Sequence, residues 1–332
     1  MKNSAWAVLL TLWGGTVATA SVEETKLGLP LVCHLGETCW VANYVDVDPT
    51  QAAHDFRCKG RTYNGHDGTD FAIRDRGVME RGVTVVAAAP GTVRRVRDGV
   101  EDRALTDEAS KRAVAGRECG NGLVVDHDGG WQTQYCHLRR DSIRVRAGEP
   151  VDRGSPLGLV GLSGKTEFPH VHLTVRRSGQ VIDPFTGRPQ SAGCGGEEKP
   201  LWQADAHIAY EDVALYNAGF WDDQPDVEAI RSGRVSERPL PPTATALVLW
   251  VDVFGIQAGD LVRFRIIGPD GQAILDKEEP VDRAQARRFI FAGQRRRAGT
   301  WSPGTYSGQV TLTRALDGHL VERSISRTVT IQ

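Results

Sequence analysis

The sequence has no marked excess of charge, no C-x-x-C pair and, beyond its N-terminus, no long apolar run. Lysine and arginine number 40 and aspartate and glutamate 42, so the formal net charge of the 332 residues is −2. A chain without a basic excess does not suggest a nucleic-acid partner. The lack of C-x-x-C pairs argues against a cysteine-rich zinc site. After the first twenty residues, no segment is long and apolar enough to span a bilayer.

The N-terminus predicts export. Lys2 is a minimal positive start, and residues 5–13 form a short apolar stretch. Residues 18–20, Ala-Thr-Ala, have the small-x-small form of a signal-peptide cleavage site. We therefore expect cleavage after Ala20 and a mature chain that starts at or near Ser21, in the periplasm or secreted. The other interpretation is an uncleaved membrane anchor, for which the apolar stretch is short.

An even number of cysteines in an exported chain indicates disulfides, and the connectivity is not fixed by their number. The chain has six: Cys33, Cys39, Cys58, Cys119, Cys136 and Cys194. If a hairpin turns at Asp128-Gly129, the cysteines at 119 and 136 fall at nearly matching positions on opposite strands. Cross-strand Cβ atoms are then close enough for a disulfide, so this pairing is predicted.

The four other cysteines leave two possibilities. A short local loop makes Cys33–Cys39 the next expectation, which leaves Cys58–Cys194 to join the region before residue 60 to the region near residue 195. Pairing of Cys33 or Cys39 with Cys58 stays open.

From residue 83 onward, short strand-like runs broken by glycines predict an all-β protein with little helix. Hairpins are expected within residues 122–138 and 260–275, where Asp-Gly and Pro-Asp-Gly form the turns. A polar stretch, residues 99–116, is expected to be an inserted loop with one helical turn. "EDVALYNAGF" (211–220) and "DVEAIRSG" (226–233) are expected to form two short helices ended by glycine.

The composition changes near residue 239, where a proline cluster is followed by further alternating strand-like runs. Their spacing predicts an Ig-like β-sandwich. The expected organisation is a signal peptide (1–20), an N-terminal segment (21–58), a β-sheet domain (59–195), a linker with short helices (196–236) and a C-terminal β-sandwich domain (237–332).

Two histidines lie two residues apart in "FPHVHLTV", residues 168–175. The run is typical of a strand, and residues i and i+2 of a strand point to the same side. His170 and His172 therefore share a face, with the apolar side chains on the other. Imidazole is the commonest metal ligand, so the pair suggests a metal or catalytic site that needs partners elsewhere.

Two other motifs supply those partners. "GHDGTDF" holds His66 and Asp70, and "YCHLR" holds His137 at the end of a hairpin strand. In a straight strand, His66 and Asp70 would lie about 13 Å apart. That is too far for one zinc ion, so Gly68 is expected to supply a bend. A lone aspartate or histidine of this kind is more often structural. Together, however, two histidines and an aspartate form a zinc site with an open fourth position, and two more histidines can move protons.

Here the sequence resembles the lysostaphin-type (LytM-like) zinc peptidoglycan metallopeptidases, over roughly residues 65–184. The motifs "GHDGTD", "AAAPGTV", "GNGLVVDHDGGWQTQYCHL", "VRAGEPVDRGSPLGLVGLSG" and "PHVHLTVR" occur in the order seen in that family. The resemblance implies a small β-sheet core with a groove above it. It implies that Zn²⁺ is bound by His66, Asp70 and His172. The assisting catalytic residues would be His137 and His170.

The activity implied is hydrolysis of a peptide bond in a peptidoglycan stem peptide or cross-link. The competing interpretation is a non-catalytic relative that binds and activates cell-wall amidases, although such proteins usually lack a zinc ligand. "SGKTEFPH" in front of the His-x-His pair, Cys136 in place of an alanine, and the long insertion at 99–116 depart from the family pattern. These departures affect the expected shape of the substrate groove.

Other residues receive structural interpretations. His127 is expected to be structural, as are the histidines outside the motifs: His34, His54, His207 and His319. Asn121 lies where the family often has an asparagine near the site, but it is not expected to be a ligand.

A third interpretation makes the C-terminal sandwich a glycan- or protein-binding module. Trp250 and Trp301 could serve it, although sandwich aromatics usually belong to the core.

Overall fold

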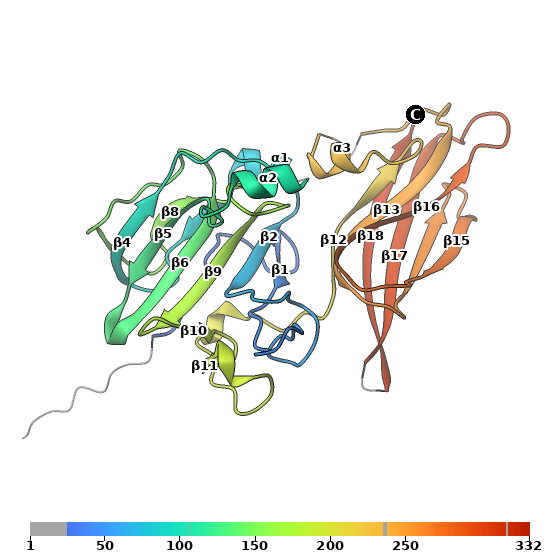
Figure 1. The fold of residues 1–332 in the computed structure, drawn as a ribbon. Helices are drawn as coiled ribbons and strands as arrows, with labels where there is room; N and C mark the ends of the chain where they lie inside the picture. The colour runs from blue at the N-terminus through green and yellow to red at the C-terminus, as the bar shows by residue number, and fades with distance from the viewer. Residues whose placement is uncertain (1–24, 106, 235–237, 317) are drawn as a thin grey trace, which may run out of the picture.

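The computed structural model describes residues 25–105, 107–234, 238–316 and 318–332 (Figure 1). The expected signal peptide and its cleavage site lie outside these residues. Almost all regular structure in the described ranges is β, which confirms the predicted all-β class. The helices found there are all too short, or too polar, to cross a bilayer. Figure 1 shows two β-rich parts side by side, here called the N-terminal part (residues 25–211) and the C-terminal part (residues 212–332).

The N-terminal part is built around one antiparallel sheet with the strand order β1-β2-β9-β6-β5-β4-β7. In chain order these strands are β1 (Cys39–Asn43), β2 (Thr69–Ile73), β4 (Gly91–Arg97), β5 (Asn121–Asp126), β6 (Trp131–Leu138), β7 (Pro150–Val151) and β9 (His170–Arg177). The hairpin partner of β9 is β10 (Gln180–Asp183), followed by β11 (Arg188–Pro189). A separate pair joins β3 (Thr84–Val86) to β8 (Pro156–Leu159). The helices are α1 (Arg76–Arg81), α2 (Glu108–Ala113) and the three-residue 3-10 helices η1 (Asp128–Gly130), η2 (Gln190–Ala192) and η3 (Ala204–Ala206).

Along the central strands, side chains alternate between the hydrophobic core on one face of the sheet and a polar face on the other. Phe71 of β2, Tyr135 of β6 and Leu173 of β9 belong to the main hydrophobic cluster and are fully buried. Successive strand residues point to opposite faces. The neighbours Asp70 and His172 therefore emerge on the other side of the sheet, opposite each other in the β2–β9 pairing.

The C-terminal part is a sandwich of two sheets, with orders β12-β13-β16 and β15-β14-β17-β18. Its strands are β12 (Ala214–Trp221), β13 (Ala246–Ile256), β14 (Leu261–Ile267), β15 (Ala273–Pro280), β16 (Gln285–Arg295), β17 (Gly304–Leu316) and β18 (His319–Ile331). Leu249 and Val251 of one sheet share a core with Phe264 and Leu312 of the other. This arrangement agrees with the predicted sandwich. Trp250 is buried and Trp301 packs against the core.

One of the two helices expected in the linker (residues 196–236) does not form, so that prediction is wrong. Residues 214–221 form strand β12, because they pair with β13, for example Ala218 with Val251. Tertiary pairing overrides a local helix preference of this size. The other helix is present as α3 (Val227–Arg231), capped by Asp226. The insertion at 99–116 contains α2, which agrees with the single helical turn expected there.

The disulfides Cys33–Cys39, Cys58–Cys194 and Cys119–Cys136 are present as expected. The geometry behind the third differs from the expectation. In the β5–β6 ladder, Asn121 pairs with Leu138. If β5 continued regularly toward its start, Cys119 would lie beyond the position opposite Cys136. Instead Cys119 lies before β5, and the chain turns at Gly120, whose φ is +62°. This turn, and not cross-strand register, brings the two Cα atoms to 4.8 Å.

Candidate active site

The five predicted site residues meet on one face of three neighbouring strands. Asp70 lies on β2, His170 and His172 lie on β9, and His137 lies on β6; His66 is in the turn that leads into β2. The pairing of Cys136 with His172 places His137 beside β9. All five side chains are buried. The structure therefore brings together every residue that the motifs singled out.

Three potential ligand atoms converge on one point. Asp70 Oδ1 lies 3.1 Å from His66 Nε2 and 2.8 Å from His172 Nδ1. The two imidazole nitrogens lie 3.1 Å from each other. The same three residues form a cluster able to hold a metal ion.

In His66 and His172, the ring nitrogen that points away from the cluster fixes the tautomer. His66 Nδ1 lies 2.6 Å from the carbonyl oxygen of Tyr44, which can only accept, so Nδ1 carries the proton and Nε2 keeps a lone pair. His172 Nε2 lies 3.1 Å from the Asp67 carboxylate, which leaves the lone pair on Nδ1. Three acceptors thus face one another, and a proton or a cation is needed between them. Two nitrogens and a carboxylate oxygen form a donor set that suits zinc.

The pKa values of His172 and Asp70 also show that the cluster requires a proton or a cation. Burial alone lowers the pKa of His172, but the hydrogen bonds and charges of Asp67 and Asp70 raise it to about 9. Burial opposes ionisation of Asp70, yet the neighbouring His66 and His170 hold its pKa well below the usual range. Without a metal, a proton on His172 relieves the convergence. A bound cation takes the place of that proton.

Two glycines let the turn approach the sheet. Gly65 has φ +78°, a conformation that side chains rarely adopt. Gly68 is needed for space: a Cβ there would lie 2.5 Å from His172 Nε2. The bend expected at Gly68 is therefore spread over the turn, and Gly68 itself permits the close approach.

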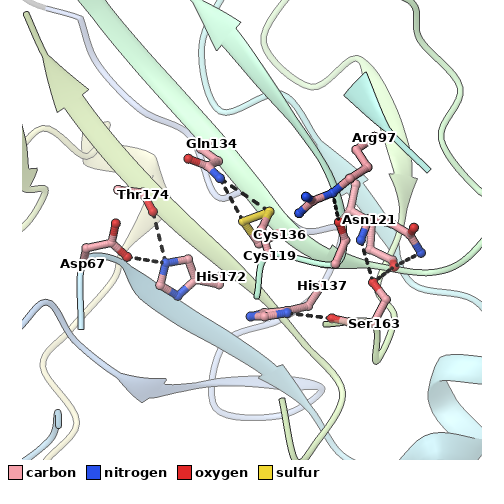
Figure 2. The surroundings of a disulfide bond; sticks show 12 residues. Asp67, Arg97, Cys119, Asn121, Gln134, Cys136, His137, Ser163, His172 and Thr174 are labelled. Carbon is pink, nitrogen blue, oxygen red and sulfur yellow. Dashed lines mark hydrogen bonds and ion pairs between the residues drawn. A yellow bond between two sulfur atoms is a disulfide. The ribbon is translucent and has the colours of Figure 1, made fainter. Parts of the chain in front are cut away.

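His137 is held in a strained conformation. Its φ is +63°, which is uncommon for a residue other than glycine. Its backbone N–H donates to Cys119 O at 2.8 Å, and Nδ1 lies 2.8 Å from Ser163 O (Figure 2). Nδ1 therefore carries the proton and Nε2 has the lone pair. Burial, followed by the nearby His170 and His172, holds the pKa of His137 well below its usual value. A neutral imidazole can accept a proton.

His170 is fixed in the same way. Its Nδ1 lies 2.9 Å from Phe168 O and 3.1 Å from Thr166 Oγ1. Its Nε2 lies 3.3 Å from Asp70 Oδ1, beside the ligand cluster. The ring centroids of His137 and His170 are 4.7 Å apart. In both catalytic candidates Nδ1 thus faces a carbonyl oxygen; Nε2 of His170 lies against the Asp70 carboxylate.

Three residues around the cluster were not predicted. Asn43 on β1 donates from Nδ2 to Asp70 Oδ2 at 2.8 Å. Asp67 bonds His172, as Figure 2 shows, and accepts from Arg176 at 2.8 Å. The half-exposed Tyr63 has its ring 4.5 Å from that of His66. Asp67 lies inside the "GHDGTD" motif and could have been noticed there. Asn43 lies far upstream and carries no local signal.

Two of the residues that were set aside, His127 and Asn121, have other partners. His127 bonds Pro90 O at 2.6 Å and Thr133 Oγ1 at 2.8 Å, which is a structural role. The Asn121 amide donates to Val100 O and Leu138 O. It therefore anchors the start of the insertion and has no hydrogen left for another acceptor.

The insertion runs along the segment that supports the catalytic candidates. Leu162 N donates to Asp102 Oδ1 at 2.6 Å, and Leu105 N donates to Thr166 O at 3.0 Å. Residues 162–166 also supply Ser163 O to His137 and the Thr166 hydroxyl to His170. The insertion thus stabilises the backbone segment, residues 162–166, that hydrogen-bonds both His137 and His170.

Known proteins resemble the region that carries this site. Residues 64–184 match Peptidase family M23, which confirms the resemblance expected over 65–184. An "Uncharacterized metalloprotease" of Haemophilus influenzae is 30% identical over 121 residues, covering 36% of this chain and 20% of that protein. Peptidoglycan DD-endopeptidase ShyB of Vibrio cholerae is 32% identical over 118 residues, covering 36% of this chain and 22% of the relative. This chain thus matches about a fifth of the length of these relatives.

Among solved structures, a zinc containing peptidase from Vibrio cholerae is 26% identical. The match covers 44% of this chain and 39% of that one, with a TM-score of 0.28.

Proposed function

We propose that this chain, whose residues 64–184 form a Peptidase family M23 domain, is an exported zinc endopeptidase that cuts peptide bonds in peptidoglycan stem peptides or cross-links. The observation that carries the proposal is the convergence of His66 Nε2, Asp70 Oδ1 and His172 Nδ1, beside two further histidines whose Nδ1 atoms each face a carbonyl oxygen. Relatives named as peptidoglycan DD-endopeptidases support the substrate class.

In this proposal His66, Asp70 and His172 hold the zinc. When bound, zinc polarises a peptide carbonyl and makes water a stronger nucleophile. The outer contacts from Tyr44 O and Asp67 orient the two imidazoles, and Asn43 orients the carboxylate.

His137 and His170 handle protons and charge. Each holds its Nδ1 proton on a carbonyl oxygen, so each can accept a proton from the attacking water at Nε2. A protonated Nε2 can then donate to the developing oxyanion or to the leaving amine. The histidine that accepts the water's proton is the one that can pass it on to the leaving amine, and the other can donate to the oxyanion when it carries a proton on both nitrogens.

Purified sacculi and the zinc-loaded protein test the proposal. The expected result is release of muropeptides whose masses identify the cut bond, and no release by the His172→Ala variant. An amidase regulator would instead bind zinc, release nothing by itself and raise the rate of an added wall amidase. That outcome would overturn the endopeptidase proposal.

A further inference from the structure

The two parts of the molecule share a hydrophobic cluster on the face of the sheet that carries the site, where Ala72 pairs with His170. Trp40 of β1 and Ala72 of β2 pack with Tyr216 of β12 and Phe254 of β13. The rings of Tyr216 and Phe254 stack at 4.1 Å, and Phe168 packs against the same cluster. The sandwich is therefore packed against the sheet that carries the site.

β13 is buried on both faces at this contact. Leu249 and Val251 point into the sandwich core, whereas Asp252 and Phe254 point toward the N-terminal part and are about 1% exposed. A strand buried on both faces lies within a packed structure. The contact between the two parts is thus a continuous interior and not a flexible tether.

Phe168 connects that interior to His170. Its ring centroid lies 4.8 Å from that of His170 and 5.1 Å from that of Phe254. Its carbonyl oxygen also accepts from His170 Nδ1 at 2.9 Å. One residue therefore restrains the imidazole both through its ring and through its backbone.

Arg287 of β16 also contacts the Phe168 ring. Its guanidinium carbon lies 5.5 Å from the Phe168 ring centroid. Nε donates to Tyr216 OH at 2.7 Å, and one terminal nitrogen donates to Asp252 at 3.1 Å. Only 14% of the Arg287 side chain is exposed, and a desolvated guanidinium strengthens its attraction to an aromatic face.

We propose that Arg287 and Phe254 of the C-terminal sandwich are positioning residues for His170, acting through Phe168. An imidazole can rotate about its side-chain bonds unless neighbours fix it. Packing by Phe168, itself clamped by the sandwich, keeps Nε2 directed toward Asp70 and the ligand cluster. The inference rests on the proposed function for its catalytic meaning. It gives the C-terminal part a role in hydrolysis in addition to any binding role.

Arg287→Met tests the clamp, because methionine keeps an apolar side chain against Phe168 and removes the charge. Asp252 keeps its two hydrogen bonds from Arg231, so the buried carboxylate stays paired. Arg288→Met is the matched control: its side chain lies on the opposite face of β16 and pairs with Asp282. Hydrolysis is measured on the muropeptide substrate identified with sacculi.

We expect Arg287→Met to lower kcat about 10-fold with little change in KM or zinc content, because a misplacement of about 1 Å can cost about 100-fold. Arg287→Lys should recover much of the rate, because lysine restores a cation over the ring. Phe168→Leu should lower kcat, and Phe168→Tyr should retain it. Arg288→Met should match the wild type. An Arg287→Met enzyme with wild-type kcat, or an equal loss in Arg288→Met, would overturn the inference.

A readout without turnover separates this inference from the proposed function. Imidazole ¹H–¹⁵N spectra of the zinc-loaded protein should show the His170 signals shifted or broadened in Arg287→Met and unchanged in Arg288→Met. If the wild type digests no substrate but His170 responds, the endopeptidase proposal fails and the positioning role stands. If His170 is unchanged in Arg287→Met, the positioning role fails whatever the activity.

Discussion

Two buried polar clusters, one in each part of the molecule, are built in opposite ways. In the sandwich, Arg314 meets Asp260 through paired contacts of 2.8 and 2.6 Å, and it also donates to the carbonyls of Asp212 and Gly255. Each of these donors meets an acceptor. In the N-terminal part, His66, Asp70 and His172 present three acceptors to one another.

The difference separates a structural cluster from the candidate functional one. A buried ion pair whose hydrogen bonds are satisfied is complete as it stands, and removing one partner leaves a buried charge. Acceptors that converge without a donor require a proton or a metal ion, and perturbed pKa values cluster at functional sites. Burial is similar in the two clusters, so the pattern of donors and acceptors distinguishes them.

The largest expected effect comes from removing a ligand. His172→Ala, His66→Ala or Asp70→Ala should lose bound zinc and lower hydrolysis by about 10³-fold or more, because a metal supplies several kcal/mol of transition-state stabilisation. Metal analysis beside sacculus digestion measures both. The exposed His319 is the matched control, and His319→Ala should keep both zinc and activity. A His172→Ala protein with full zinc content would refute the ligand assignment.

Substitutions of His137 and His170 should lower activity without removing the metal. His170→Ala and His137→Asn should retain most of the zinc while kcat falls by about 10²–10⁴-fold. Asparagine is chosen at 137 because it tolerates the positive φ found there. The same metal and digestion assays apply. Zinc loss in His170→Ala, with zinc retained in His172→Ala, would reverse the roles of the two β9 histidines.

Breaking the sandwich cluster should affect stability alone. Arg314→Met leaves Asp260 buried and unpaired, so the free energy of unfolding should fall by about 3–5 kcal/mol. Zinc content of the folded protein should not change. Arg263 pairs with Asp276 in the same two-bond geometry but on the surface, so Arg263→Met should change stability little. Urea unfolding compares the two; equal losses would show that burial does not set the difference.

The smallest expected effect concerns the outer contact of a ligand. Asp67→Asn removes the charge that orients His172 through Nε2, and metal affinity should fall about 10–100-fold. Competition with a chelator of known affinity measures the change. Asp205, exposed on η3, supplies the control Asp205→Asn. Unchanged affinity in Asp67→Asn would mean that the Thr174 hydroxyl, 3.0 Å from the same nitrogen, is sufficient to orient the ring.

Much of the site could be predicted because its signals are local. The two-residue period of a strand placed His170 and His172 on one face, and the turn at Asp128-Gly129 defined the β5–β6 hairpin. The helix expected over residues 211–220 failed because pairing with β13 is a long-range contact that local propensity does not report.

The chain by itself determined the chemistry available: which residues can bind a metal or move a proton, their spacing along the strands, and the turns between those strands. Only the tertiary structure decided which of these atoms meet. Asn43 reaches Asp70 because β1 pairs with β2, and Phe168 meets Arg287 because the sandwich packs on the sheet. Such contacts depend on pairing and packing between residues far apart in sequence, and no local pattern encodes them.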